Sequence, residues 1–215
     1  MRSVLRAFQL LQQRFRAARM RAFMREFDLS PAARILDVGG TPGIWSTASA
    51  GARIVLLNMP RARAEAFTAT LGYVEGDACH LPFADRSFDV VFSNSVIEHV
   101  GSAGAQERFA QEVARVGRGY WIQTPNRNFP IETHLLMPLV HLLPKRWAAF
   151  VVQRFSLWAL IHRPLPAENL WYLEHVLGEV RLCSTRDLRR LFPDASIREE
   201  RSCLFTESLI AVRNA

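Results

Sequence analysis

A short apolar run that ends in an acidic residue and a cluster of glycines constrains the fold more than any other stretch. Residues 35–43 read ILDVGGTPG, so that Asp37 is followed by Gly39, Gly40 and Gly43. Such a run is typical of a buried parallel strand, and the glycines allow a tight turn into the N-terminus of a helix. Glycine lets the backbone contact a ligand, and the first helical N–H groups carry partial positive charge. The stretch therefore predicts an α/β fold with a ligand-binding turn.

Length and composition indicate one domain with a core of its own. The chain has 215 residues, of which 49% are hydrophobic, and it contains no run of 18 uninterrupted apolar residues. Its three cysteines are far apart and lack C-x-x-C spacing, so we predict neither a disulfide framework nor a zinc site. A reducing cytoplasm is the expected compartment. The net charge of +7 is compatible with an anionic partner such as nucleic acid or a membrane surface.

Hydrophobic periodicity predicts an N-terminal helix followed by alternating strands and helices. Residues 2–27 carry apolar side chains at three- and four-residue steps, which is typical of an amphipathic helix that packs on a domain or lies on a membrane surface. Further strands are predicted at 53–58, 73–78, 88–94, 119–124, 196–201 and 208–213. Further helices are predicted at 44–50, 60–71, 104–115 and 184–193.

Polar residues follow the predicted strands. Asp37 ends the first strand, Asn58 the second and Asp77 the third, while Asn94 closes the fourth. Asn58 lies where a nucleoside-binding α/β fold places an acidic residue that accepts hydrogen bonds from ribose hydroxyls. Its amide oxygen can accept one such bond, although without the help of a charge. Because carboxyl ends of parallel strands meet at one edge of a sheet, we expect these residues to lie close together there.

Two motifs resemble the class I S-adenosylmethionine-dependent methyltransferases. The turn resembles their motif I, D/E-x-G-x-G-x-G, with Thr41 in place of the middle glycine. Residues 76–91, with the pattern G-D-A-x-x-L-P-F-x-D-x-S-F-D-V-V, resemble the methyltransferase type 11 branch. The resemblance covers residues 33–125 and 184–213. It implies a doubly wound, seven-stranded, mostly parallel sheet (a Rossmann-like methyltransferase fold) that ends in an antiparallel strand pair.

The resemblance also implies a cofactor, S-adenosylmethionine, across the carboxyl ends of the first four strands. Asn58 would meet the ribose, Asp77 would accept the adenine amino group, and Asn94 would close on the methionine side. The implied cofactor-binding residues are Asp37, Gly39, Gly40, Gly43, Asn58, Asp77, Ala78 and Asn94.

Two histidines are candidates for a catalytic role. His99 follows the fourth strand, and His134 follows a further predicted strand end, so either could act as a general base for an acceptor hydroxyl. The alternative for His99 is a structural role at a helix start, together with Glu98. Metal-assisted relatives carry E-x-x-E-H at this position, but Ser95 replaces the first acid here, so we predict no metal. A metal-assisted RNA methyltransferase is therefore only an alternative, and we do not expect nucleic acid as a partner.

The sequence predicts four parts: an amphipathic helix in 1–30, a cofactor-binding core in 31–125, an apolar helical insertion in 126–183, and 184–215 completing the core. The insertion is expected to cap the acceptor side, to touch a lipid surface, or to form a secondary core or dimer face. The resulting prediction is a methyltransferase for a small, hydrophobic or lipid-like acceptor, with peripheral membrane contact left open. The alternative is an inactive scaffold of the same fold, and the sequence does not indicate the oligomeric state.

Overall fold

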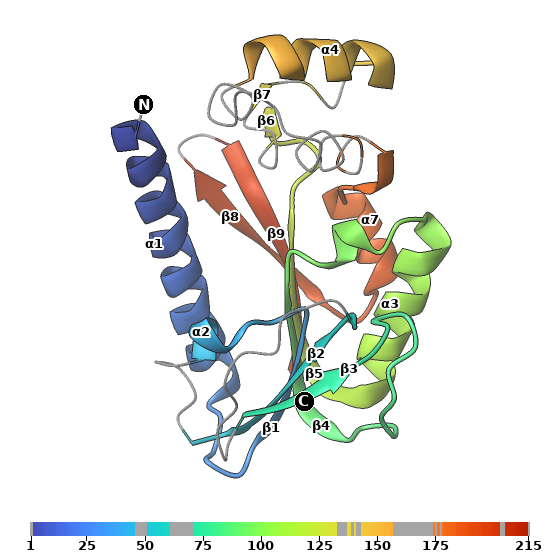
Figure 1. The fold of residues 1–215 in the computed structure, drawn as a ribbon. Helices are drawn as coiled ribbons and strands as arrows, with labels where there is room; N and C mark the ends of the chain where they lie inside the picture. Colours follow the sequence, from blue (N-terminus) through green and yellow to red (C-terminus); the bar gives the residue numbers. More distant parts are fainter. Residues whose placement is uncertain are drawn as a thin grey trace.

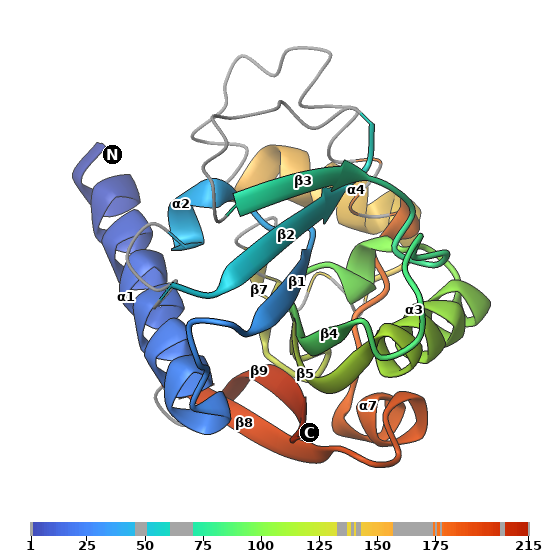
Figure 2. The same cartoon turned by 90° about the horizontal axis from the view of Figure 1, so that it is seen from below.

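A computed structural model gives the fold of most of the chain. It describes residues 2–45, 51–60, 71–132, 137–138, 140, 143–156, 174, 176, 178–202 and 205–214. A seven-stranded sheet in the order β3-β2-β1-β4-β5-β9-β8 forms its centre (Figures 1 and 2). The strands are β1 (Arg34–Val38), β2 (Arg53–Asn58), β3 (Leu71–Glu75), β4 (Phe88–Asn94), β5 (Gly117–Pro125), β8 (Ser196–Ser202) and β9 (Phe205–Arg213).

The pairing of these strands confirms the predicted fold class. Strands β1 to β5 pair in parallel, whereas β9 is antiparallel to both β5 and β8. Strand β1 lies between β2 and β4, so the strand order reverses there. In open α/β sheets, ligands bind outside the carboxyl ends of the strands at such a reversal. The glycine-rich turn after β1 is therefore at the position where a ligand is expected.

Helices cover both faces of the sheet. Helix α1 lies on one face, whereas α3 and α7 lie on the other (Figure 2). The helices are α1 (Arg2–Phe27), α2 (Pro42–Trp45), α3 (Ala103–Val116), α4 (Lys145–Phe155) and α7 (Thr185–Leu191), with a 3-10 helix η1 (Ile97–His99). These bounds confirm the helices predicted over 2–27, 104–115 and 184–193. Most of the helices predicted over 44–50 and 60–71 lies outside the described residues.

An aromatic cluster joins α1 to the sheet. Phe23 of α1 is fully buried, and its ring lies 4.9 Å from that of Phe92 on β4 and 6.0 Å from that of Trp121 on β5, centroid to centroid. Trp45 of α2 completes the cluster, 5.9 Å from Phe23. Such edge-to-face aromatic contacts add to the free energy of burial. The last turns of α1 thus pack on the domain through Met20 and Phe23, whereas Ala18, which lies on the predicted apolar stripe, is exposed.

Strand β3 differs from its prediction. It runs from Leu71 to Glu75, whereas the sequence predicted a strand over 73–78. Asp77 therefore lies in a turn beyond the strand: its Oδ1 accepts a hydrogen bond from the Cys79 backbone N–H at 2.8 Å, and its Oδ2 lies 2.9 Å from His80 Nδ1. An aspartate side chain that bonds the backbone two residues ahead favours a turn over a strand.

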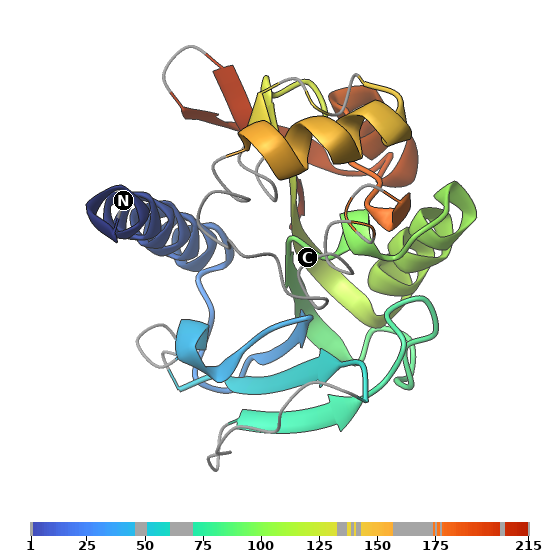
Figure 3. The same cartoon turned by 45° about the horizontal axis from the view of Figure 1, so that its top comes forward.

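The insertion contains strands as well as a helix. Residues 126–183 were predicted to be helical, and α4 agrees with this. However, β6 (Ile131–Glu132) and β7 (Met137–Pro138) form a short antiparallel ladder that was not predicted. Helix α4 lies at the end of the molecule toward which the parallel strands point (Figures 1 and 3).

Part of the stretch 76–91, which resembles the type 11 branch, is held against helix α3 by hydrogen bonds. Arg115 of α3 donates hydrogen bonds to the backbone carbonyls of Leu81 and Phe83 and to the carboxylate of Asp85. Glu112, one turn earlier on the same helix, accepts a bond from the Leu81 N–H at 2.6 Å. These two side chains fix the loop between β3 and β4 to α3, and they hold the Asp77 turn in place from one side.

Candidate functional site

The turn after β1 has almost no room for side chains. Gly39 has a positive φ of 77°, and a Cβ there would lie 2.3 Å from Cγ2 of Val96. A Cβ on Gly40 would lie 1.8 Å from Oδ2 of Asp37. At Gly43, in contrast, a Cβ would meet nothing within 4 Å among the residues that the structure describes. Two of the three glycines are thus required by the packing of the turn, and the third is not.

The side chain of Asp37 packs against this turn at Gly40. The residue is only 1% exposed, and its Oδ2 accepts a hydrogen bond from Trp45 Nε1 at 2.7 Å. Burial raises the pKa of this carboxyl group to about 7, against the lowering effect of the Trp45 bond. A carboxyl group that is only half ionised near neutral pH thus lies directly under the glycine turn.

A cavity of about 470 Å³ opens beside the turn. Its size falls within the range of roughly 300–1,000 Å³ that is usual for small-molecule sites. Four of the predicted cofactor-binding residues line it, Gly39, Asn58, Asp77 and Ala78, and so does the predicted catalytic His99. The other lining residues are Val38, Leu57, Met59, Gly76, Cys79, Val96, Val100, Ala105 and Arg108.

Hydrogen bonds hold the polar residues of this cavity in position. The side-chain amide of Asn58 donates to the Gly40 carbonyl at 3.0 Å, which ties the end of β2 to the turn after β1. Beyond the end of the neighbouring strand β3, the two carboxylate oxygens of Asp77 are engaged by Cys79 and His80, and the His80 contact contributes most to lowering the Asp77 pKa. Asp77 is therefore a carboxylate at neutral pH.

The sequence analysis did not predict two residues that line this cavity, Met59 and Arg108. Met59 follows Asn58 directly and is 63% exposed, which is unusual for a large apolar side chain. Its position after a strand end could have indicated a ligand contact. Arg108 projects from α3, one turn after Ala105. Nothing in one sequence distinguishes it from the many exposed arginines of this chain.

The remaining predicted residues lie elsewhere. Asp37, Gly40 and Gly43 do not line the cavity, although the first two build the turn that does. Asn94 lines a different cavity, where its Oδ1 accepts a hydrogen bond from the guanidinium of Arg19. His134 lies outside the described residues.

Glu98 and His99, the last two residues of η1, lie in different environments. His99 is exposed and lines the cavity, whereas Glu98 is fully buried and accepts a hydrogen bond from Thr124 Oγ1 at 3.0 Å. Within the described part of the chain, no group of three His, Cys, Asp or Glu side chains is placed to hold a metal ion.

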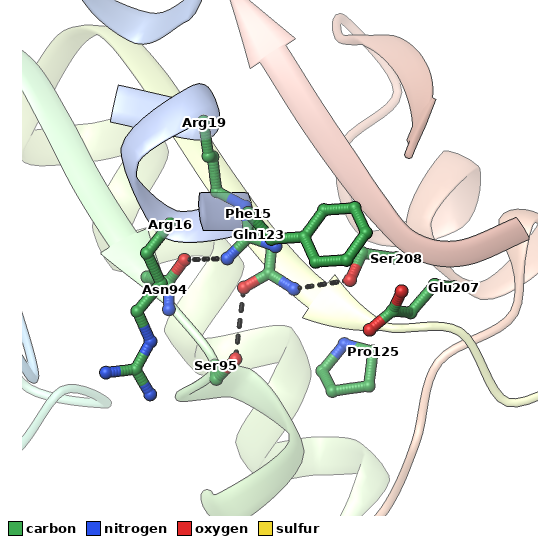
Figure 4. Close-up of a pocket in the computed structure, with 9 residues that line it drawn as sticks. All are labelled: Phe15, Arg16, Arg19, Asn94, Ser95, Gln123, Pro125, Glu207 and Ser208. Carbon is green, nitrogen blue, oxygen red and sulfur yellow. Dashed lines mark hydrogen bonds between the residues drawn. The ribbon is translucent and has the colours of Figure 1, made fainter. Parts of the chain in front are cut away.

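A second, smaller cavity of about 90 Å³ lies between α1 and the ends of β4, β5 and β9 (Figure 4). Its polar floor is a chain of hydrogen bonds: Ser95 Oγ donates to Gln123 Oε1, and Gln123 Nε2 donates to Ser208 Oγ, each at 3.0 Å. Arg19 and Glu207 form part of its walls, and burial raises the pKa of Glu207. The cavity is therefore suited to a polar group.

Two consecutive residues line the two different cavities. Ser95 lines the smaller one, and Val96 lines the larger. Ser95 has a φ of 58°, a left-handed conformation that is uncommon for residues other than glycine and costs on the order of 1–3 kcal/mol. This turn directs successive residues into different cavities.

Comparisons with known proteins relate this chain to methyltransferases. Residues 36–119 match the family model described as "Methyltransferase domain". An uncharacterized methyltransferase of Mycobacterium tuberculosis is 38% identical over 73 residues, which is 31% of this chain and 29% of that protein. The matches to such curated relatives thus span only about a third of the relatives' length.

Solved structures share the fold over nearly the whole chain. A Haloferax volcanii complex of the Trm112 methyltransferase activator with a methyltransferase matches with a TM-score of 0.58 at 16% identity, covering 96% of this chain and 92% of that one. Human N-acetylserotonin methyltransferase, solved with S-adenosylmethionine, matches with a TM-score of 0.51 at 15% identity, covering 97% and 55%. At these identities the likeness concerns the fold.

Proposed function

We propose that this chain, which belongs to the type 11 branch of the class I S-adenosylmethionine-dependent methyltransferases, transfers the methyl group of its cofactor to a small, hydrophobic or lipid-like acceptor. The observation that carries the proposal is the larger cavity. Gly39, Asn58, Asp77 and Ala78 come from three separate segments of the sequence, were predicted to bind one nucleoside, and line one cavity at the reversal of the strand order.

The residues present fit this cofactor. Gly39 keeps its side of the cavity free of a Cβ, so the backbone can contact the ligand. Asn58 is held at the end of β2, where it can meet the ribose, and the Asp77 carboxylate can accept from the adenine amino group. The cofactor supplies a methyl group that is already activated on a sulfonium. The chain then has to orient the acceptor, and alignment of two reactants is worth roughly 7–11 kcal/mol.

The acceptor side is proposed to include the smaller cavity. Its Ser95 is adjacent in sequence to Val96 of the larger cavity, so a polar group of the acceptor could bind there beside the cofactor. His99 lines the larger cavity and is the proposed general base for a weakly acidic hydroxyl acceptor.

Calorimetric titration tests the cofactor assignment. We expect both S-adenosylmethionine and its demethylated product to bind, because the proposed contacts involve the nucleoside that they share. If neither ligand binds, the proposal is wrong. A methyl transfer assay against lipid and small-molecule extracts then distinguishes an enzyme from an inactive scaffold that keeps the cofactor site.

Replacing Asp77 with alanine should weaken cofactor binding by about 1–3 kcal/mol, or roughly fivefold to 150-fold, because a carboxylate acceptor is lost and its turn loosens. Asp85→Ala is the matched control. It removes a carboxylate from the same loop region, but its side chain is 76% exposed, pairs with Arg115 and does not line the cavity. Equal affinities for the two variants would refute the role of Asp77.

A further inference from the structure

Helix α4 presents large aromatic side chains to solvent. Trp147 is 55% exposed, Phe150 is 53% exposed, and Phe155, the last residue of the helix, is 71% exposed. Trp147 and Phe150 are three residues apart and so share one face of the helix. The helix is anchored by its other face, where Ala148 and Val152 are buried. The exposed aromatic face is thus a feature of a packed helix.

The charge on this helix has one sign. Its sequence, KRWAAFVVQRF, contains Lys145, Arg146 and Arg154 and no acidic residue. The guanidinium carbon of Arg154 lies 5.6 Å from the centre of the Phe150 ring, so positive charge and aromatic surface occur together. The whole chain carries a net charge of +7.

The position of α4 places this face at the functional end of the molecule. Helix α4 lies at the end toward which the parallel strands point (Figure 1). The residues that line both cavities include residues at or just beyond the carboxyl ends of these strands. Leu143, two residues before the helix, is 41% exposed and extends the apolar surface. Within the described part of the chain, no helix is long and apolar enough to cross a bilayer.

We propose that α4 binds in the interface of a bilayer that contains anionic lipids, with Trp147, Phe150 and Phe155 among the acyl chains and headgroups. Aromatic side chains favour this region, and basic residues on the same helix are attracted to anionic headgroups. A second copy of the chain is a poorer partner for this helix, because the sequence of α4 contains three basic residues and no acidic residue, so two such helices would repel each other. Docking by α4 would place the proposed acceptor site at the lipid surface, a consequence that rests on the proposed function.

Vesicle sedimentation tests this proposal. The full chain should sediment with phosphatidylcholine vesicles that contain phosphatidylglycerol, less with pure phosphatidylcholine, and less again at high salt. The double variant Trp147→Ser/Phe150→Ser should bind at least tenfold more weakly. Because both side chains are more than half exposed, the variant should fold, and circular dichroism checks that it does.

A matched pair of charge variants locates the contact. Arg154→Gln on α4 should weaken binding to phosphatidylglycerol vesicles severalfold. Arg118→Gln removes the same charge from a 59% exposed position near the start of β5, at the opposite end of the strands, and should leave binding unchanged. Equal losses from the two variants would show attraction by net charge alone and would overturn the assignment to α4.

Two other outcomes would also overturn the proposal. One is wild-type protein that fails to sediment with anionic vesicles. The other is a dimer, seen by analytical ultracentrifugation, that Trp147→Ser/Phe150→Ser dissociates while vesicle binding is unchanged. The same samples are titrated with S-adenosylmethionine, so failure of membrane binding is distinguished from failure of the cofactor assignment.

Discussion

Replacing Asp37 with asparagine is expected to remove a pH dependence of stability worth about 4 kcal/mol. The Asp37 carboxyl group is buried under the glycine turn, and burial raises its pKa from 3.8 to about 7. Each pKa unit of difference between folded and unfolded states corresponds to about 1.4 kcal/mol. The asparagine variant keeps an acceptor for the Trp45 N–H and cannot ionise.

The direction of the effect follows from proton binding. Below pH 3.8 the carboxyl group is protonated in both states, so it contributes no pH dependence. Between pH 3.8 and about 7, the folded protein keeps the proton while the unfolded chain has lost it, so the free energy of unfolding falls as pH rises. Above the pKa of Asp37 in the folded protein, the free energy of unfolding falls no further on account of this group. Asp37→Asn should therefore be more stable than the wild type at pH 8, in the absence of ligand.

Urea unfolding between pH 5 and 8 measures this difference. We expect the gap between the two proteins to widen in favour of Asp37→Asn as pH rises. Asp85→Asn serves as the control, because it removes an acid whose side chain is 76% exposed. If the free energies of unfolding of wild type and Asp37→Asn run parallel over this range, Asp37 does not retain its proton in the folded protein.

The parts of the structure that follow from local pattern were accessible from the sequence. The apolar run before Asp37 is a buried strand because β2 and β4 cover both of its edges and helices cover its faces. The helix over 184–193 was found because Ser184 and Asp187 form a capping box, which a local motif encodes. Both features depend on residues close together in the chain.

The parts that depend on distant contacts were not accessible. Arg19 of α1 pairs with Glu200 of β8 at 2.5 Å and donates to Asn94 of β4. This contact joins three segments and places the Asn94 side chain at the smaller cavity, away from the predicted nucleoside site. In the sequence, Arg19 resembles every other arginine of a basic amphipathic helix, so no local pattern predicts that it pairs with Glu200.

Replacing Gly39 with alanine is expected to reduce affinity for S-adenosylmethionine at least tenfold and to destabilise the folded protein. Two separate costs contribute. The positive φ of 77° disfavours any side chain, at roughly 1–3 kcal/mol, and the new Cβ would lie 2.3 Å from Cγ2 of Val96. Relief of that contact requires the turn or Val96 to move, and both line the cavity.

Two further variants separate these costs. Gly43→Ala lies in the same motif, but its Cβ meets no described residue within 4 Å, so titration should give an affinity close to that of the wild type. In Gly39→Ala/Val96→Ala the collision with Cγ2 is removed while the backbone strain stays, so part of the lost affinity should return relative to Gly39→Ala. If Gly43→Ala is as damaging as Gly39→Ala, the ligand itself fills the space at Gly43, and the geometry of the turn would not explain the requirement for glycine. If the double variant shows no recovery, the contact with Val96 is not what closes the site.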